Sequence, residues 1–261
     1  MSVDTVPLAA AAERTRTGDL WLFRGRSTAD RLIQTLTNAP VNHVGVAVVL
    51  DDMPPLMWHA EMGRALPDVW TGRHQRGVQL HDLEDAVRQW TGSYGQRAWF
   101  RQISPEVGPE QEDALLESIA RLNGVSFPSA GRLTARWVRG RWAARGRGRG
   151  RGPGTVASGP GDGRTRQDDD DAARRRWRLP LPTRSVRARR DTAGPAMRLE
   201  AAYCAEVVGS TLESMGVLLP AGDTSWYDPG RFWSGDDLPL APGWDYGGEI
   251  AVTVNPVTPR R

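Results

Sequence analysis

The stretch that decides the fold reads Val41-Asn42-His43-Val44-Gly45-Val46-Ala47-Val48-Val49-Leu50. From Val44 to Leu50 it is apolar and rich in β-branched residues, which predicts a buried strand. The run Leu56-Met57-Trp58-His59-Ala60 predicts a second strand, and Asp51–Pro55 forms the turn between the two. The pair carries one histidine at the start of its first strand and another near the end of its second.

Helices and further strands are predicted on both sides of this pair. Pro109–Leu122 predicts a helix, with acidic residues in its first turn and Gly124 just past its end. Tyr203–Met215 has one apolar face and predicts a second helix. A third is predicted to start at Ser27, whose side chain can cap it. The further strands are predicted at Leu20–Phe23, Val78–Leu80, Arg97–Ile103 and Ile250–Val254. This mixture predicts an α+β domain.

The charge of the chain is divided very unevenly. The 261 residues carry a formal net charge of +3, and all 34 basic residues are arginine. Residues 131–198 hold 19 arginines against 6 aspartates, and the other 193 residues hold 15 arginines against 25 acidic residues. The segment is low in complexity and includes the run Arg145–Gly152, which alternates arginine and glycine. We therefore predict an acidic domain interrupted by a basic, mostly disordered insert.

Several protein classes are excluded or disfavoured by the sequence. No run of 18 apolar residues exists, which argues against a transmembrane helix. The N-terminus lacks the basic and apolar regions of a secretory signal, so we expect a cytoplasmic protein, or one peripheral at the membrane. A single cysteine excludes an intrachain disulfide framework. No phosphate-binding loop, dinucleotide fingerprint or Gly-x-Ser-x-Gly motif is present.

The single thiol, Cys204, is the first candidate for chemistry. Its predicted place is at or near the first turn of a helix, where the helix dipole and unbonded N–H groups favour a thiolate and can receive an oxyanion. The structural alternative is a small buried hydrophobic residue. Position alone leaves both interpretations open.

Histidines on the predicted strands supply candidate partners for a nucleophile. A polar ring at the mouth of a buried strand, such as His43, is costly unless it is paired or used, although a satisfied core histidine is the alternative. His59 and Glu61 are two residues apart on a strand and share a face, so either can orient a neighbouring imidazole. His74 and His81 lie in a polar stretch and are interpreted as surface or loop groups.

The sequence does not favour a metal centre. A zinc site built from His43, His59, Glu61 and His81 is conceivable, but these residues have no recognised ligand spacing. We therefore expect no metal and no cofactor. The aromatic loop region around Asp228–Trp233 suits either a substrate wall or a packed loop.

Taken together, these motifs resemble a known family. "GDLWLFRG", a helix, "NHVGVAVV", "LMWHAE", a helix, "YCAEVV" at a helix start and "YDPGRFW" occur in an order similar to that of the permuted papain-like cysteine hydrolases of the NlpC superfamily, in particular the YiiX/YaeF-like amidase group. Lecithin:retinol acyltransferase-like enzymes share the arrangement. The resemblance runs from about Thr17 to Ile250 and excludes the insert.

The resemblance implies roles for individual residues. Cys204 matches the nucleophile and His43 matches the base. Related YiiX-like chains tend to have a glutamate where this chain has His59, so His59 is the first choice for the orienting residue and Glu61 the second. Tyr203 flanks the nucleophile and is a candidate to wall the substrate pocket.

The resulting prediction is a circularly permuted papain-like domain, with an antiparallel sheet packed on helices. Residues 1–130 and 199–261 form the domain, and residues 131–198 form the insert. The predicted activity is hydrolysis or acyl transfer on an amide, ester or thioester, through an acyl-enzyme, with a small-molecule, peptide or lipid-derived substrate.

Two rival functions remain from the same residues. An inactive papain-like fold could act as an adaptor that binds nucleic acid or an anionic membrane through the arginine-rich insert. The weaker rival is a metal-dependent hydrolase that uses the histidines. The insert could also be an inert, tolerated loop.

Overall fold

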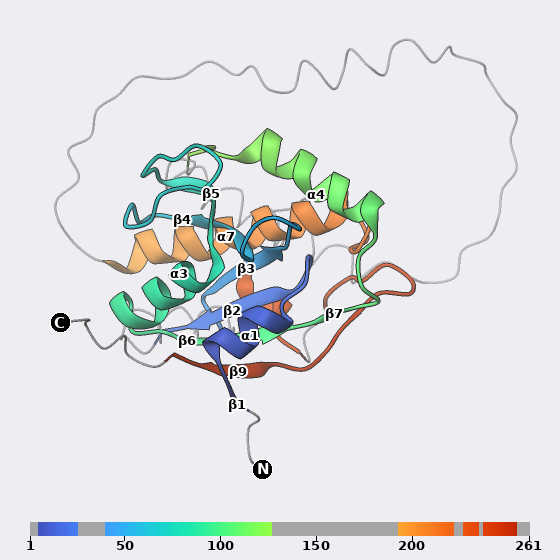
Figure 1. Cartoon of the computed structure of the whole chain (residues 1–261), viewed down its shortest axis with the longest axis horizontal. Coiled ribbons are helices and arrows are strands. Elements are labelled where there is room, and N and C mark those ends of the chain that lie inside the picture. Colours follow the sequence, from blue (N-terminus) through green and yellow to red (C-terminus); the bar gives the residue numbers. More distant parts are fainter. Residues whose placement is uncertain (1–4, 26–39, 127–192, 222–226, 235–236, 255–261) are drawn as a thin grey trace, which may run out of the picture.

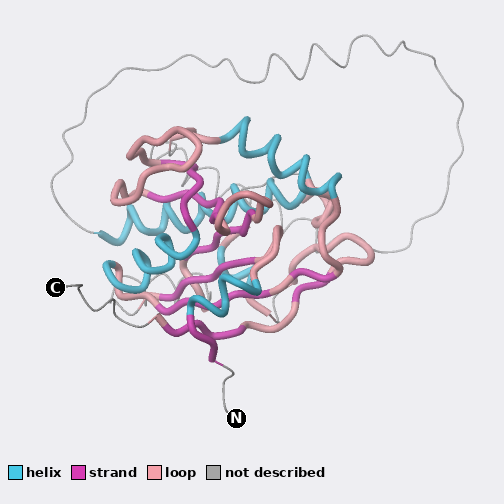
Figure 2. Tube along the Cα trace, viewed as in Figure 1, coloured by secondary structure: helices cyan, strands magenta, loops and turns pink. Residues whose placement is uncertain are grey.

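A sheet that is mostly antiparallel, with helices packed on it, forms the folded part of the chain (Figure 1). The computed structural model describes residues 5–25, 40–126, 193–221, 227–234 and 237–254, and of residues 193–202 it describes the backbone but not the side chains. Figure 2 shows the strands grouped together with helices around them. The α+β class predicted from the sequence is confirmed.

The strands and helices have the following bounds. The strands are β1 (Thr5–Pro7), β2 (Leu20–Arg24), β3 (His43–Val48), β4 (Leu56–Glu61), β5 (Gly77–Asp82), β6 (Arg97–Arg101), β7 (Ile103–Ser104), β8 (Asp245–Tyr246) and β9 (Ile250–Thr253). The helices are α1 (Leu8–Arg14), α3 (Leu83–Arg88), which continues into the π-helix η1 (Gln89–Ser93), α4 (Pro109–Leu122), α7 (Ala193–Ser214) and the 3₁₀-helix η3 (Pro229–Phe232).

Seven of these strands form one sheet in the order β1-β9-β6-β2-β3-β4-β5, and β7 pairs with β8. All pairs in the large sheet are antiparallel except β1 with β9. The predicted pair of strands is the hairpin β3–β4, in which Val46 lies opposite Trp58. Each strand of this central part is buried on both faces, because helices cover both.

Alternation along the strands divides the apolar side chains between two cores. On one face, Val44, Val46 and Trp58 pack with residues of α7, and the Trp58 indole donates a hydrogen bond to Thr211 of that helix at 3.2 Å. On the other face, residues from α1 and α3 pack against the sheet. The second core includes Leu8, Ala11, Trp21, Phe23, Met57, Leu83, Val87, Trp90 and Phe100.

Most predicted elements are confirmed, and some bounds differ. The helix α4 has the bounds that its acidic first turn and Gly124 predicted. The helix α7 begins at Ala193, which is ten residues earlier than predicted and inside the segment assigned to the insert. The short helices α1 and α3 were not predicted. The predicted helix after Ser27 and the insert up to residue 192 lie outside the described residues.

A buried carboxylate, Asp19, joins the start of β2 to the first residue of β7. It accepts hydrogen bonds from the backbone N–H groups of Ile103, at 2.8 Å, and Arg16, at 2.9 Å. Burial raises the pKa of Asp19 from 3.8 to about 6, and the two N–H groups and the charge of Arg16 oppose this rise. The native state therefore binds a proton more tightly than the unfolded chain does.

This pKa shift predicts how stability depends on pH. Because the native pKa of Asp19 is the higher one, its protonation adds stability that is fully present below pH 3.8 and is lost as the pH rises through 6. The difference in unfolding free energy between the wild type and Asp19→Asn should therefore shift by about 2 kcal/mol between pH 4 and pH 6.5. Urea titrations of both proteins measure it, and a difference that stays constant would contradict it.

Candidate functional site

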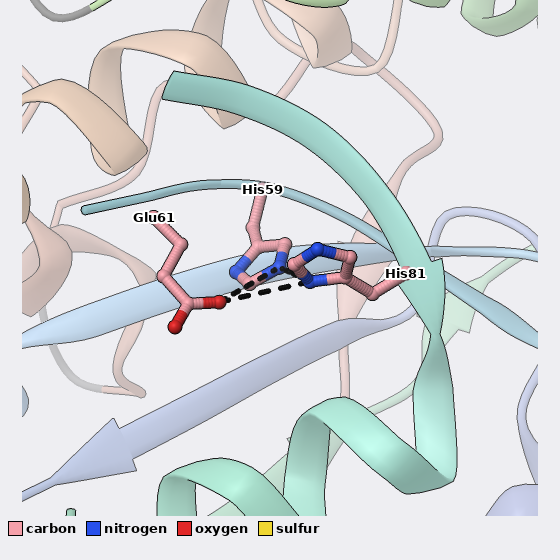
Figure 3. Close-up of side chains that lie close together, drawn as sticks. All are labelled: His59, Glu61 and His81. Atoms are coloured by element: carbon pink, nitrogen blue, oxygen red, sulfur yellow. Dashed lines mark hydrogen bonds and ion pairs between the residues drawn. The ribbon is translucent and has the colours of Figure 1, made fainter. Parts of the chain in front are cut away.

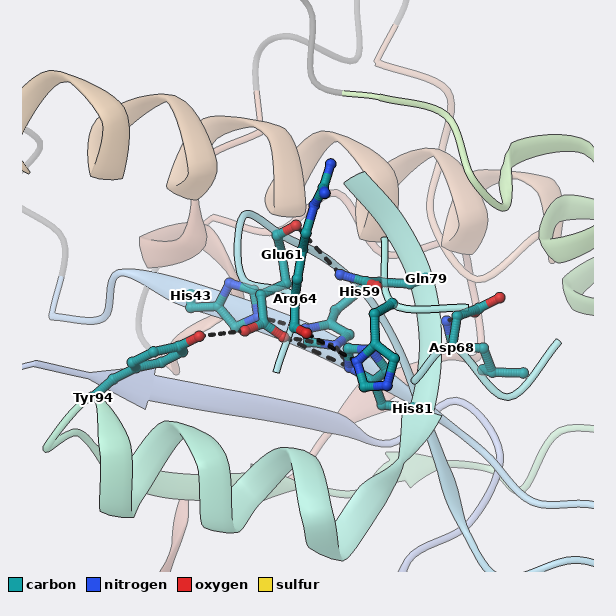
Figure 4. Close-up of polar contacts among 10 residues, drawn as sticks. His43, His59, Glu61, Arg64, Asp68, Gln79, His81 and Tyr94 are labelled. Atoms are coloured by element: carbon teal, nitrogen blue, oxygen red, sulfur yellow. Dashed lines mark hydrogen bonds and ion pairs between the residues drawn. The ribbon is translucent and has the colours of Figure 1, made fainter. Parts of the chain in front are cut away.

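Three histidines from adjacent strands form a continuous chain of hydrogen bonds (Figure 4). Nε2 of His43, on β3, lies 2.9 Å from Nδ1 of His59, on β4. Nε2 of His59 lies 2.9 Å from Nδ1 of His81, on β5. The three side chains are at most 1 % exposed.

Strand register brings these rings to one face of the sheet. His43 lies opposite Phe23, and His81 lies opposite Met57, whose side chain belongs to the core beneath α1 and α3. Trp90, in η1, stacks on the ring of His43 with centroids 3.8 Å apart and planes 13° from parallel. The indole thus covers one side of the imidazole and fixes the plane of its ring.

A buried carboxylate lies beside the second and third rings (Figure 3). Oε2 of Glu61 is 3.6 Å from Nδ1 of His81 and 4.0 Å from Nε2 of His59. The Tyr94 hydroxyl donates a hydrogen bond to Oε1 of Glu61 at 2.7 Å. The expectation that His59 and Glu61 share a face is confirmed, and their shared partner is His81.

Gly63 allows the chain to pass close to this carboxylate. A Cβ atom at this position would overlap both Oε1 of Glu61 and the hydroxyl oxygen of Tyr94. Both atoms lie at the ends of side chains, so they can move away, but only by breaking the hydrogen bond between them. Gly63 therefore protects the position of the Glu61 carboxylate.

Gly63→Ala should lower the unfolding free energy by about 1.5 to 3 kcal/mol, the usual contribution of a hydrogen bond to a charged group. In a Tyr94→Phe background, where that bond is already absent, the same change should cost much less. Denaturant titrations of the two single variants and the double variant measure the coupling. Gly92→Ala is the matched control, because nothing lies within 4 Å of a Cβ atom there. Additive effects of the two changes would contradict the prediction.

Burial determines the protonation of the cluster. It lowers the pKa of His43 to about 3 and that of His81 to about 4, and it lowers the pKa of His59 well below 6.5. The neighbouring rings lower the pKa of His59 further. Burial raises the pKa of Glu61, and the Tyr94 hydroxyl opposes the rise. The three rings are therefore neutral at pH 7.

A chain of neutral rings has only two hydrogen-bonding orders, because each contact needs one N–H and one lone pair. In the first order, His43 donates from Nε2 to His59, which donates in turn to His81. Nδ1 of His43 then holds a lone pair. In the second order both bonds are reversed, and Nδ1 of His43 carries a proton. Within the described residues, Nδ1 of His43 and Nε2 of His81 are buried without a hydrogen-bond partner.

Cys204 lies in the interior of α7, eleven residues after its first residue. The prediction that it opens a helix is wrong. Its backbone N–H lies within the hydrogen-bonded part of a helix, so the start of its own helix does not supply an oxyanion site there. The error arises because residues up to 198 were assigned to the insert, whereas the helix begins at Ala193.

The side chain of Cys204 is fully buried in the core between the sheet and α7. The side chain of His43 lies with Phe23 and Trp90, which belong to the other core. The helix α7 packs directly on β3, the strand that begins with His43. No hydrogen bond between the thiol and Nδ1 of His43 is present in the described part of the chain. Tyr203 is also buried in the core beneath α7.

His74 and His81, both interpreted from the sequence as surface or loop groups, differ in their burial. His74 is exposed, and its ring contacts the carbonyl oxygen of Arg64 at 3.0 Å, as expected for a loop group. His81 is 1 % exposed, so its assignment to the surface is wrong. The polar residues around His81 in the sequence hid the strand β5, in which Val78 and Leu80 face one core and Gln79 and His81 face the cluster.

Residues that sequence reasoning missed complete the cluster. Trp90 and Tyr94 belong to a helical segment that no sequence pattern singled out, and both contact candidate site residues. The signal available was an aromatic spacing of four residues after an amphipathic segment, which is common in helices that only pack against a core.

His59, Glu61 and His81 are also the residues of the described chain whose ligand atoms could hold a metal ion, since these atoms lie within 4.8 Å of one another. They are three of the four residues, all except His43, whose spacing in the sequence matches no recognised zinc motif. Geometry rather than sequence spacing groups them.

Comparison with known proteins gives a weak likeness. No family model matches the chain, and no curated protein matches it. The structure is similar to the crystal structure of the metalloprotein yiiX from Escherichia coli O157:H7, a DUF1105 protein, with 20% identity and a TM-score of 0.32. The likeness covers 45% of this chain, which spans about 55% of that protein. Among the described residues, no helix is both long and apolar enough to cross a membrane.

Proposed function

We propose that the protein is a cysteine-dependent hydrolase or acyltransferase with a circularly permuted papain-like domain, acting on an amide, ester or thioester. Cys204 is the nucleophile, His43 is the base and His59 orients the ring of His43. The observation that carries the proposal is the 2.9 Å contact between Nε2 of His43 and Nδ1 of His59, which leaves Nδ1 of His43 without a partner among the described residues.

A catalytic base needs one ring nitrogen held by a neighbour and the other available to the nucleophile. The three buried rings meet this need in the first hydrogen-bonding order. Nε2 of His43 then donates to His59, and Nδ1 of His43 keeps a lone pair. The stacking of Trp90 holds the plane of the base. His81 and Glu61 lie beyond His59 and act as positioning residues.

In the proposed reaction, Nδ1 of His43 takes the proton of the Cys204 thiol, and the sulfur attacks the carbonyl carbon of the substrate. The tetrahedral intermediate collapses to an acyl-enzyme as His43 protonates the leaving group. Water, or another acceptor, then gives up a proton to His43 and releases the acyl group from sulfur. The helix α7, which carries the thiol, packs on β3, the strand that begins with the base. The two side chains lie in cores on opposite faces of the sheet, so the proposed proton transfer requires them to approach each other.

The proposal is tested with the full chain and three probes: a p-nitrophenyl ester, an acyl thioester and a peptide p-nitroanilide. We expect turnover of at least one probe, inactivation by iodoacetamide and no loss of activity with EDTA. Loss of activity with EDTA and resistance to iodoacetamide would instead show a metal-dependent hydrolase and overturn the proposal.

Deletion of the arginine-rich insert distinguishes the hydrolase from the adaptor. A variant lacking residues 131–192 leaves α7 intact and should retain turnover, whereas an adaptor that works through its arginines would lose its binding to RNA or anionic vesicles. Retained binding in Cys204→Ala, together with no turnover in the wild type, would favour the adaptor.

A further inference from the structure

Three potential metal ligands meet on the face of the sheet beneath α3 (Figure 3). They are Nε2 of His59, Nδ1 of His81 and Oε2 of Glu61, with separations of 2.9, 3.6 and 4.0 Å. We infer that these three side chains bind one divalent transition-metal ion, for which Zn²⁺ is the best match. The inference goes beyond the proposed function and does not involve the thiol.

The separations suit a tetrahedral ion. Zinc bonds to histidine nitrogen and carboxylate oxygen are about 2.0 to 2.2 Å long, so two ligand atoms at a tetrahedral centre lie about 3.4 Å apart. The three observed separations fall on both sides of this value. Binding requires the two ring nitrogens to part by about 0.5 Å, which exchanges one ring–ring hydrogen bond for two metal bonds.

The charge of the cluster favours a cation. Glu61 is 1 % exposed, and among the described residues no arginine forms an ion pair with it. A buried carboxylate without a compensating charge is costly. A divalent ion between Glu61 and the two neutral rings supplies that charge, and two imidazoles with one carboxylate are a donor set typical of zinc.

The groups around the ligands are those that orient metal-binding side chains. With Nε2 of His59 bound to metal, its Nδ1 carries a proton and donates to Nε2 of His43 at 2.9 Å. The Tyr94 hydroxyl holds the other oxygen of Glu61. His59 and Glu61 are thus each held by a hydrogen bond from a neighbouring side chain before any ion binds.

Metal binding has a consequence for the proposed base, and this step rests on the proposed function. A metal on His59 imposes the second order on the His43–His59 contact, so that neutral His43 carries its proton on Nδ1. That atom then cannot accept the thiol proton. The metal-loaded protein is the inactive form, and removal of the ion restores the base.

The site is tested by titrating the untagged full-length protein, freed of metal with EDTA and exchanged into buffer, with Co²⁺ alone. We expect one equivalent to give visible absorption bands of a tetrahedral ion, and Zn²⁺ to displace it. No intense sulfur-to-cobalt band should appear, since Cys204 is not a ligand. Glu61→Gln and His81→Gln should each weaken binding at least about tenfold, and His74→Gln, at an exposed histidine, should not.

Thermal unfolding gives a second readout that does not depend on activity. Zn²⁺ should raise the midpoint of the wild type and of His74→Gln, but not that of Glu61→Gln, and circular dichroism checks that each variant is folded. The inference is overturned if Co²⁺ gives no such bands, if Glu61→Gln and His81→Gln bind as the wild type does, or if His74→Gln removes binding. Because binding is read without substrate, these outcomes are separate from failure of the proposed hydrolase.

Discussion

Replacement of Cys204 by serine is expected to lower turnover of any acyl substrate by at least about a thousandfold. The hydroxyl has nearly the size of the thiol, but it does not ionise beside a neutral imidazole at pH 7. The proposed acyl transfer needs the anion as nucleophile. Steady-state hydrolysis of the best probe measures the effect.

The matching control for this prediction concerns stability. Cys204 is fully buried in an apolar core, so a serine hydroxyl there costs about 1 to 3 kcal/mol unless it finds a partner. Cys204→Ala avoids the polar group and should be equally inactive while remaining folded. Activity of either variant within about tenfold of the wild type would show that the thiol is a packing residue.

The metal-free protein is expected to lose stability steeply below pH 6.5. Burial holds the pKa of His43 near 3 and that of His81 near 4, whereas both rings titrate near 6.5 in the unfolded chain. A lowered native pKa contributes stability that is present above pH 6.5 and is lost as the pH falls. Between pH 6.5 and pH 5, each ring should remove about 2 kcal/mol from the unfolding free energy.

Urea titrations in EDTA at pH 7, 6 and 5 measure this loss. His43→Gln should remove part of the pH dependence. A difference in unfolding free energy between the wild type and His43→Gln that stays constant from pH 7 to pH 5 would contradict the burial of a neutral His43 ring. The comparison uses differences between variants, so the opposite effect of Asp19 cancels.

The hairpin and its histidines were predictable because local pattern specifies them. An apolar, β-branched run with a turn of Asp, Met and Pro residues defines β3 and β4 without any knowledge of the rest of the chain. The two-residue period then places His59 and Glu61 on one face. Helix α4 was equally clear from its acidic start and its terminal glycine.

The third ring could not be predicted in the same way. His81 joins the cluster because β5 pairs with β4 in one particular register, with His81 opposite Met57. A short strand of mixed polarity does not specify that register by itself. Tyr94 and Gly63 also depend on the tertiary arrangement. Tyr94 contacts Glu61 from 33 residues away in the sequence, and Gly63 brings the backbone close to the Glu61 carboxylate.

The start of α7 illustrates a different error. Composition assigned residues up to 198 to the insert, and the helix nevertheless begins at Ala193. Low complexity is a property of the whole segment, whereas a helix can extend from a well-packed core into it, stabilised by the turns that follow. The position of Cys204 within its helix was wrong for this reason.

The most direct test of the Cys204–His43 pair is the detection of an acyl-enzyme by intact-protein mass spectrometry, with an activated thioester as acyl donor. We predict a single acyl adduct that peptide mapping assigns to Cys204. The rate of its formation should fall at least about a hundredfold in His43→Ala and stay unchanged in His74→Ala. An adduct that forms equally fast without His43, or none in the folded wild type, would contradict the proposed catalytic pair.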